Sequence, residues 1–254
     1  MKLLVLILLF FNVTYAHADF FRKDDFEVAL GAQYSSLLQK RGIITYEGFQ
    51  AVPIYSIQLG NPSLLLAGSA LYYTQNIFTE NQIFRIRLNV DSTLDHPLYY
   101  TDEDEEDRIR RESTSELDLF YELRSKQGSH LRWMFSQDLK AHKGFYTEIY
   151  SHIALIDFFK NDKGQILVQP GVFISLGGGN QEHNRYLYGE GASHFRATNV
   201  QYGLSILSLG AIDEFWPTLR VSRFEILGDS NRTASYVEET QGWQAELLFA
   251  FKVY

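Results

Sequence analysis

The chain has 254 residues, no cysteine, five prolines and a formal net charge of −8. The absence of cysteine excludes disulfide scaffolds, cysteine-based zinc sites and thiol catalysis. The negative charge argues against nucleic acid as a partner, because nucleic-acid binding relies on Lys and Arg at phosphates. The length fits one large β domain, and no shift in composition marks a linker.

The first residues have the organisation of a secretory signal. Lys2 precedes an apolar segment from Leu3 to Phe11, and Ala16-His17-Ala18 forms an A-x-A cleavage site. The apolar segment is too short to cross a bilayer, which requires roughly 20 residues. We therefore expect residues 1–18 to be a cleaved signal peptide and residues 19–254 to form the exported domain.

Alternation of apolar and polar residues with a period of two predicts a series of strands after the signal segment. The predicted strands are 26–35, 49–59, 63–73, 82–91, 116–123, 131–136, 145–155, 166–176, 196–209, 215–226 and 241–254. Several connections between them are short, which favours sequential antiparallel neighbours. Pro53 weakens the second strand. The segments 38–46, 177–180 and 228–240 are expected to be loops.

Seven charged residues fall on the polar faces of neighbouring predicted strands. They are Arg85, Arg87, Arg132, Glu116, Asp118, Glu122 and Glu148. A soluble sandwich would present this face to water, whereas a membrane barrel would present it to the lumen. Three bases against four acids are close to balance, so in a barrel we expect them to pair and close the interior as a structural charge network.

The predicted loop before the strand at 116–123 contains six consecutive acidic residues, 102–107, followed by Arg108, Arg110 and Arg111. Clustered carboxylates suit hard cations, but this run lacks the spacing and the glycine of a calcium loop. We therefore expect a solvated loop.

Two Ser-His pairs, Ser151-His152 and Ser193-His194, raise the alternative of an outer-membrane lipid hydrolase. Adjacent residues of a strand point to opposite faces, so neither pair can form a Ser-His hydrogen bond by itself. The seven histidines also lack metal-ligand spacing. We expect no catalytic, metal or cofactor site, and the hydrolase is the less favoured alternative.

The last segment, 241–254, has the clearest alternation in the chain. One face carries Trp243, Ala245, Leu247, Phe249, Phe251 and Val253. Such a strand suits lipid on one side and a polar interior on the other. Because an open sheet edge cannot lie in hydrocarbon, it predicts an antiparallel up-and-down transmembrane β-barrel.

Bacterial barrels of this kind have an even number of strands, and eleven are predicted above. A twelfth is expected at Asn184 to Glu190, where Tyr186 and Tyr188 would share a face. Ten strands are the alternative, if one weak segment is a loop.

Three stretches together resemble the MltA-interacting protein (MipA)/OmpV family of outer-membrane proteins. They are Tyr46-Glu47-Gly48 leading to Val52-Pro53, then Tyr186-Leu187-Tyr188-Gly189 after a Pro-Gly-Val strand, then Arg223 and Leu227-Gly228-Asp229 before a terminal Phe-Lys-Val-Tyr. The chain departs from the family at Thr233-Ala234, where the family tends to have Ser-Pro, and in its last four residues. The resemblance implies an outer-membrane barrel that acts in some members as a scaffold tying murein hydrolases to murein synthases, and in others as an adhesin or a porin-like protein.

We therefore expect a non-catalytic barrel in the cell outer membrane, surrounded by outer-membrane lipid. The resemblance adds murein hydrolase and synthase proteins as partners. A small pore and an adhesin are the alternatives. Bulky inward Arg, Glu and Tyr side chains can fill a barrel of ten to twelve strands, which favours a plugged scaffold over a wide porin.

Overall fold

The computed structural model describes residues 26–59, 63–67, 70–76, 79, 81–89, 114–125, 127–155, 159–160, 166–208, 215–237 and 239–252. The expected signal peptide, 1–18, and the acidic run, 102–107, lie outside the described residues.

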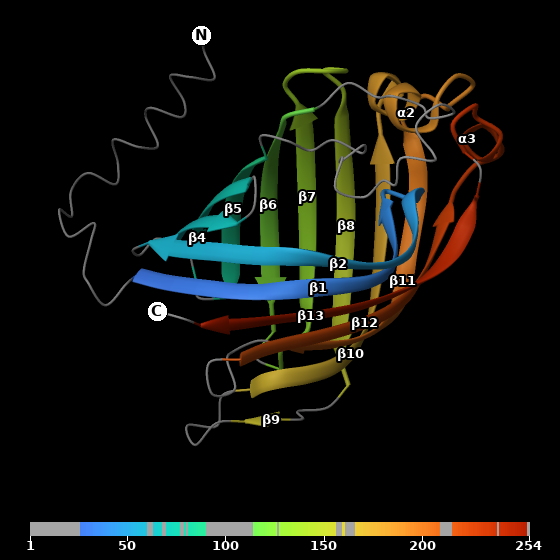
Figure 1. Ribbon diagram of the computed structural model, residues 1–254. Coiled ribbons are helices and arrows are strands. Elements are labelled where there is room, and N and C mark those ends of the chain that lie inside the picture. Colours follow the sequence, from blue (N-terminus) through green and yellow to red (C-terminus); the bar gives the residue numbers. More distant parts are fainter. Residues whose placement is uncertain are drawn as a thin grey trace, which may run out of the picture.

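The described chain is built almost wholly of strands (Figure 1). The strands are β1 (Phe26–Lys40), β2 (Ile43–Leu59), β3 (Ser63–Ala67), β4 (Ala70–Asn76), β5 (Gln82–Asn89), β6 (Glu116–Arg124), β7 (His130–Asp138), β8 (Phe145–Ala154), β9 (Phe159–Lys160), β10 (Ile166–Gly179), β11 (Arg196–Ser208), β12 (Phe215–Ile226) and β13 (Gln241–Lys252). Two short helices, α2 (Gln181–Tyr188) and α3 (Asp229–Arg232), lie between strands. Among the described residues there is no helix with the length and apolar composition needed to cross a membrane.

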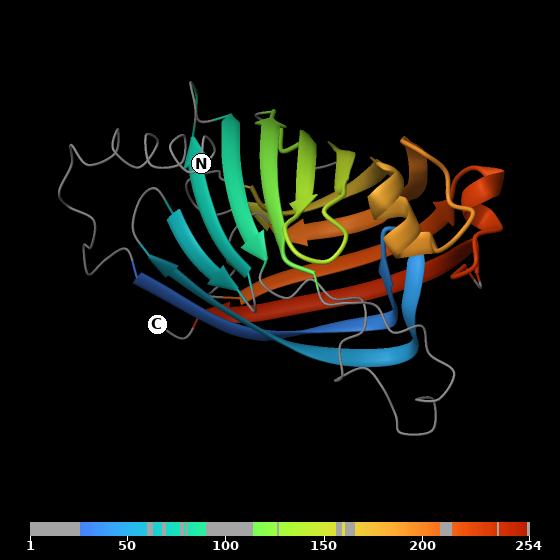
Figure 2. The ribbon, with the colours of Figure 1, turned by 90° about the horizontal axis from the view of Figure 1, so that it is seen from above.

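The strands form a closed, twelve-stranded antiparallel β-barrel (Figure 2). Closure comes from β13, which pairs with β1 on one side and with β12 on the other. The two-residue β9 is an addition at the lower end of β10 and is not one of the twelve. Strands that pair in the barrel also follow one another in the sequence, so the prediction of an up-and-down barrel of twelve strands is confirmed.

The alternation predicted from the sequence describes the two faces correctly. In β6 the residues Glu116, Asp118, Phe120 and Glu122 are buried inside the barrel, while Leu123 is exposed outside. Large exposed apolar side chains lie on β1, on β3 to β8 and on β10 to β13: Leu30, Leu66, Leu71, Leu88, Leu123, Leu131, Trp133, Ile149, Ile153, Ile174, Leu176, Tyr202, Leu204, Ile206, Leu219, Val221, Trp243, Leu247 and Phe251. The outer surface is therefore apolar and the interior is polar.

The twelfth strand was predicted in the wrong place. Residues 63–73, expected as one strand, are divided between two antiparallel strands, β3 and β4, with Ala67 paired to Ala70. Residues 184–190, expected as a strand, belong mostly to α2. Asn180 caps this helix by accepting a hydrogen bond from the amide of His183, and Gly189 ends it with a φ of 93°. Tyr188 and Leu187 are buried, which a strand at this position would not allow.

Two predicted loops are also strands. Residues 38–46 continue β1 and β2 to a tight turn, and β2 runs unbroken through Pro53. The three glycines of the predicted loop 177–180 are the last residues of β10. Glycine is needed at these positions because the space beside the backbone is filled. A side chain at Gly177 would collide with the Tyr146 hydroxyl, and one at Gly179 would collide with the His183 ring. These glycines therefore allow close packing inside the barrel and do not form a loop.

The two ends of the barrel differ. Helices α2 and α3 and the β7–β8 turn lie at one end, which we call the mouth (Figure 1). The segment 228–240, predicted to be a loop, is irregular there except for α3, yet it buries Asn231 and Ala234. Strand β1 begins and β13 ends at the opposite end.

Candidate functional site

The seven predicted charges lie inside the barrel on four consecutive strands, β5 to β8. Two pairs form among them. Arg87 donates to Asp118, whose side chain is fully buried, and Arg132 donates to Glu148 at 3.3 Å. Arg87 also lies over the Phe120 ring at 5.1 Å. These charges are therefore held by both carboxylates and aromatic faces.

The other three charges find partners outside the predicted set. Glu122 accepts from Arg124, two residues further along β6. Arg85 donates to the Thr74 hydroxyl on β4 at 3.1 Å. Glu116, at the mouth end of β6, contacts Lys40 and Arg41, which lie in the predicted loop 38–46.

That segment is the end of the β1–β2 hairpin, which we call the hairpin tip (Lys40 to Ile43). Arg41 and Gly42 form a two-residue turn between the paired Lys40 and Ile43, with φ values of 55° and 90°. Two positive φ values are typical of the turn whose twist matches a hairpin, and Gly42 meets the second at no steric cost.

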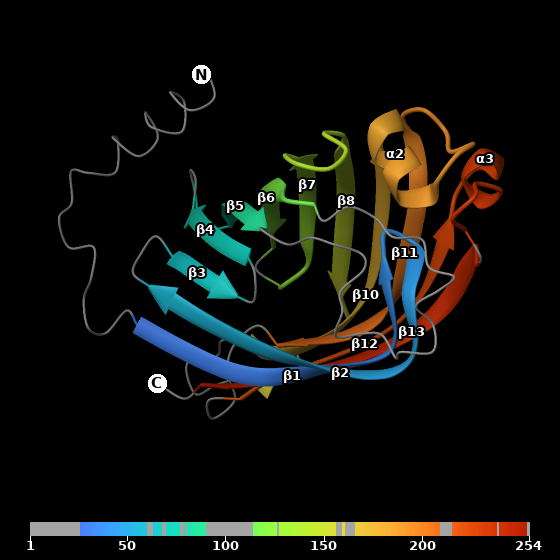
Figure 3. The ribbon, with the colours of Figure 1, turned by 45° about the horizontal axis from the view of Figure 1, so that its top comes forward.

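The hairpin bends into the mouth instead of continuing along the wall (Figure 3). Register shifts between Ser35 and Leu37 and between Leu38 and Gln39 mark the bend. The side chain of Gln39 then reaches Gln201 on β11 at 3.3 Å. The hairpin is thus tied, next to its tip, to β11, which is separated from β1 by β12 and β13 in the barrel.

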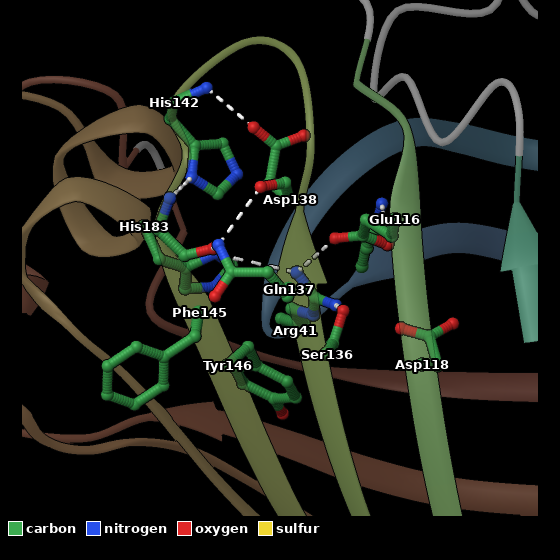
Figure 4. Close-up of polar contacts among 12 residues, drawn as sticks. Arg41, Glu116, Asp118, Ser136, Gln137, Asp138, His142, Phe145, Tyr146 and His183 are labelled. Carbon is green, nitrogen blue, oxygen red and sulfur yellow. Dashed lines mark hydrogen bonds and ion pairs between the residues drawn. The ribbon is translucent and has the colours of Figure 1, made fainter. Parts of the chain in front are cut away.

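Arg41 of the hairpin tip lies among Glu116, Ser136 and Tyr146 (Figure 4). Its guanidinium donates to Glu116 at 2.9 Å and to the Ser136 hydroxyl at 3.2 Å, and it lies 4.1 Å from the centre of the Tyr146 ring. Its backbone carbonyl accepts a hydrogen bond from the Tyr188 hydroxyl of α2 at 2.8 Å. One residue therefore joins the hairpin to β6, β7, β8 and α2.

Apolar packing covers the hairpin tip from the outside. Ile43 is 5 % exposed and belongs to one cluster with Leu187 and Tyr188 of α2, Ile226 of β12, and Ala234. Helix α2 and the segment that contains α3 thus both pack in the same cluster as Ile43. The hairpin tip, α2 and the α3 segment form one packed cap across the mouth.

Backbone hydrogen bonds to side chains hold α2 and the β7–β8 turn together. Asp138 accepts from the amides of His142 and Lys143 at 2.7 and 2.8 Å. Asn180 accepts from the amide of Phe145 at 2.9 Å and also caps α2. Asn180 therefore connects the β7–β8 turn to the start of α2.

Electrostatics in the cap favour a charged Arg41 beside neutral histidines. Burial opposes the charge of Arg41, but Glu116 together with Tyr146 and Asp118 outweighs this effect, so the pKa of the guanidinium is raised. Burial, together with nearby Arg41 and His142, holds the pKa of His183 well below its ordinary value. Burial and Arg41 also lower the pKa of His142, although Asp138 opposes that shift.

These shifts predict that acid loosens the cap. The unfolded state takes up protons on His142 and His183 below about pH 6.5, whereas the folded cap resists them, so stability is lost as the pH falls below that value. Glu116, Lys40 and Arg41 face the same site, and the two cations add to the repulsion. Hydrogen exchange of α2, corrected for intrinsic rates, should be faster at pH 5 than at pH 7.5.

The variant His142→Gln/His183→Gln is the control for the acid effect. It removes both titrating rings, so the difference between the two pH values should shrink. An unchanged difference in this variant would assign the acid sensitivity to other groups.

One residue of each Ser-His pair is buried and contacts other residues. Ser193 is buried in the cap, where its hydroxyl donates to Asn231 at 2.8 Å. His152 is buried in the lumen and stacks on His130 at 5.1 Å. Ser193 is thus held by a hydrogen bond and His152 by ring stacking.

Comparisons with known proteins add no assignment. No model of a known protein family matches this chain, and no curated protein matches it. Inferences about function therefore rest on the geometry above and on the motifs in the sequence.

Proposed function

We propose that the protein is an outer-membrane barrel with its mouth toward the cell exterior and its chain ends toward the periplasm. Two observations support the location in the outer membrane. Exposed Leu, Ile, Val and Trp side chains surround the barrel, and the first eighteen residues have the pattern of an export signal. A soluble protein rarely exposes so much contiguous apolar surface.

We further propose that the barrel is a closed, non-catalytic scaffold and not an open pore. The hairpin tip that fills the mouth is the observation that carries this proposal. Paired charges on β5 to β8 support it, because arginines and carboxylates that pair between neighbouring strands do not form a single-sign ion path. The resemblance to the MipA/OmpV family suggests murein hydrolases and synthases as the proteins that it would connect.

Cell fractionation tests the location. The mature chain, without residues 1–18, should sediment with outer membranes and resist extraction by high salt. Recovery of a folded, soluble protein from the periplasm would contradict the outer-membrane assignment.

Function is tested by two measurements on the same protein. In planar bilayers, the purified barrel should show no steady conductance. In cells, cross-linking from the periplasmic side should trap envelope proteins, with murein enzymes among them. Stable ion-selective channels without cross-linked partners would favour the pore.

A further inference from the structure

The barrel interior contains a polar cavity of about 300 Å³ below the hairpin tip. It is lined by inward side chains of β7, β8, β10, β11 and β12, including Arg132, Glu148, Ser175 and Arg220. Gln201 belongs to both regions, because it lines the cavity and accepts the hydrogen bond from Gln39 of the hairpin. The volume lies at the lower end of the range of small-molecule sites.

Two arginines of this cavity are carried on one aromatic stack. Arg132 lies 4.8 Å from the centre of the Tyr150 ring, and Arg220 lies 4.8 Å from the centre of the Phe173 ring. The Tyr150 and Phe173 rings stack on each other at 5.8 Å. Both guanidinium groups line the same cavity, and stacking on the rings restricts their motion before any ligand arrives.

The acids near Arg132 and Arg220 accept only part of the hydrogen bonds that the two guanidinium groups can donate. Arg132 donates one bond to Glu148 at 3.3 Å, and Arg220 lies 3.7 Å from Glu246, too far for a hydrogen bond. The Nε atoms of both arginines are buried without a partner among the described residues. Each guanidinium has five N–H donors, so the donors at this site exceed the acceptors supplied by the described side chains.

We propose that this cavity binds a small anion, whose carboxylate or phosphate group bridges Arg132 and Arg220. Oxygens of such a group accept paired hydrogen bonds from the planar edges of guanidinium groups. The Ser175 hydroxyl lies on the same wall and offers a further donor. The proposal is independent of the scaffold role, since a closed barrel and an open one could both hold the ligand.

Titration calorimetry of the detergent-solubilised full mature chain tests the site, with inorganic phosphate and succinate as probes. At least one probe should bind saturably, and Arg220→Gln should weaken that binding about tenfold or more. Arg223→Gln is the matched control: it lies on the same strand but faces outward beside Glu225, and it should leave binding unchanged. Tighter binding of phosphate would indicate a phosphorylated ligand, and tighter binding of succinate a carboxylic acid.

A second measurement needs no variant and serves if Arg220→Gln fails to assemble. Phenylglyoxal modifies guanidinium groups, and the bound anion should protect Arg132 and Arg220, as located by peptide mass mapping. Absence of saturable binding by both probes, equal affinity in Arg220→Gln, or binding of the diamine putrescine in place of the anions would overturn the proposal.

Discussion

Replacement of Glu116 by Gln is expected to destabilise the cap by about 3–5 kcal/mol, the usual cost of breaking a buried ion pair. The Glu116 side chain is 4 % exposed, and its carboxylate contacts Arg41 at 2.9 Å and Lys40 at 3.5 Å. The substitution leaves two neighbouring cations without their shared carboxylate. Because Arg41 connects the hairpin tip to four other elements, the hairpin should leave the mouth.

Urea unfolding monitored by heat-modified gel mobility measures this loss. Arg185→Gln is a suitable control, since it also breaks an ion pair in the cap, but the side chains of Arg185 and its partner Glu190 are 59 % and 76 % exposed. An exposed pair contributes about 0–1 kcal/mol. The double variant Arg41→Gln/Glu116→Gln should recover part of the loss, because it removes the unpaired guanidinium as well.

The same variant also tests the closed state of the barrel. If the hairpin tip blocks the mouth, Glu116→Gln should show conductance events that the parent protein lacks. Unchanged stability together with an unchanged electrical trace would mean that the ion pair does not hold the hairpin in place.

Strand faces could be predicted from the sequence because one physical rule governs them. An outer surface that is apolar and an interior that is polar force alternation at every second residue, as in Trp243 and Gln244. Trp243 is 63 % exposed on the outside, and Gln244 is 4 % exposed inside. The rule holds for each strand separately, so it does not require knowledge of the partners.

The contacts at the mouth join residues far apart in the chain, and they could not be predicted from local alternation for that reason. The segment at Lys40 to Ile43 is polar enough to be taken for a solvated loop. Its charge is instead satisfied by Glu116, which lies 75 residues away in the chain. Only closure of the barrel brings these residues together, although Arg41-Gly42 between two alternating segments was a local turn signal.

Helix α2 shows the same limitation at a smaller scale. The local signals were present, since Asn180 suits a helix start and Gly189 suits a helix end. The prediction instead followed the two-residue spacing of Tyr186 and Tyr188, under the requirement for an even number of strands. That requirement was met elsewhere, by the division of residues 63–73 into the paired strands β3 and β4.

The second large effect is expected from a charge placed on the outer apolar surface. Ile174 on β10 is 51 % exposed, and it pairs with Ser151 on β8 and Tyr202 on β11. In a bilayer, Ile174→Arg should cost about 2–4 kcal/mol if the residue lies near the midplane, because an arginine there loses its hydration. In water the same change on an exposed position should cost less than about 0.5 kcal/mol.

The adjacent residue offers a matched control. Ser175 faces the lumen cavity, so Ser175→Gln places a larger polar side chain where there is space and where polar neighbours exist. Assembly into lipid vesicles, read by heat-modified gel mobility, should be impaired by Ile174→Arg and preserved by Ser175→Gln. Equal tolerance of both variants would show that the outer surface does not contact lipid at this strand. Because the two residues are neighbours on one strand, the difference between them isolates the environment of each face from the strand's own tendency to form.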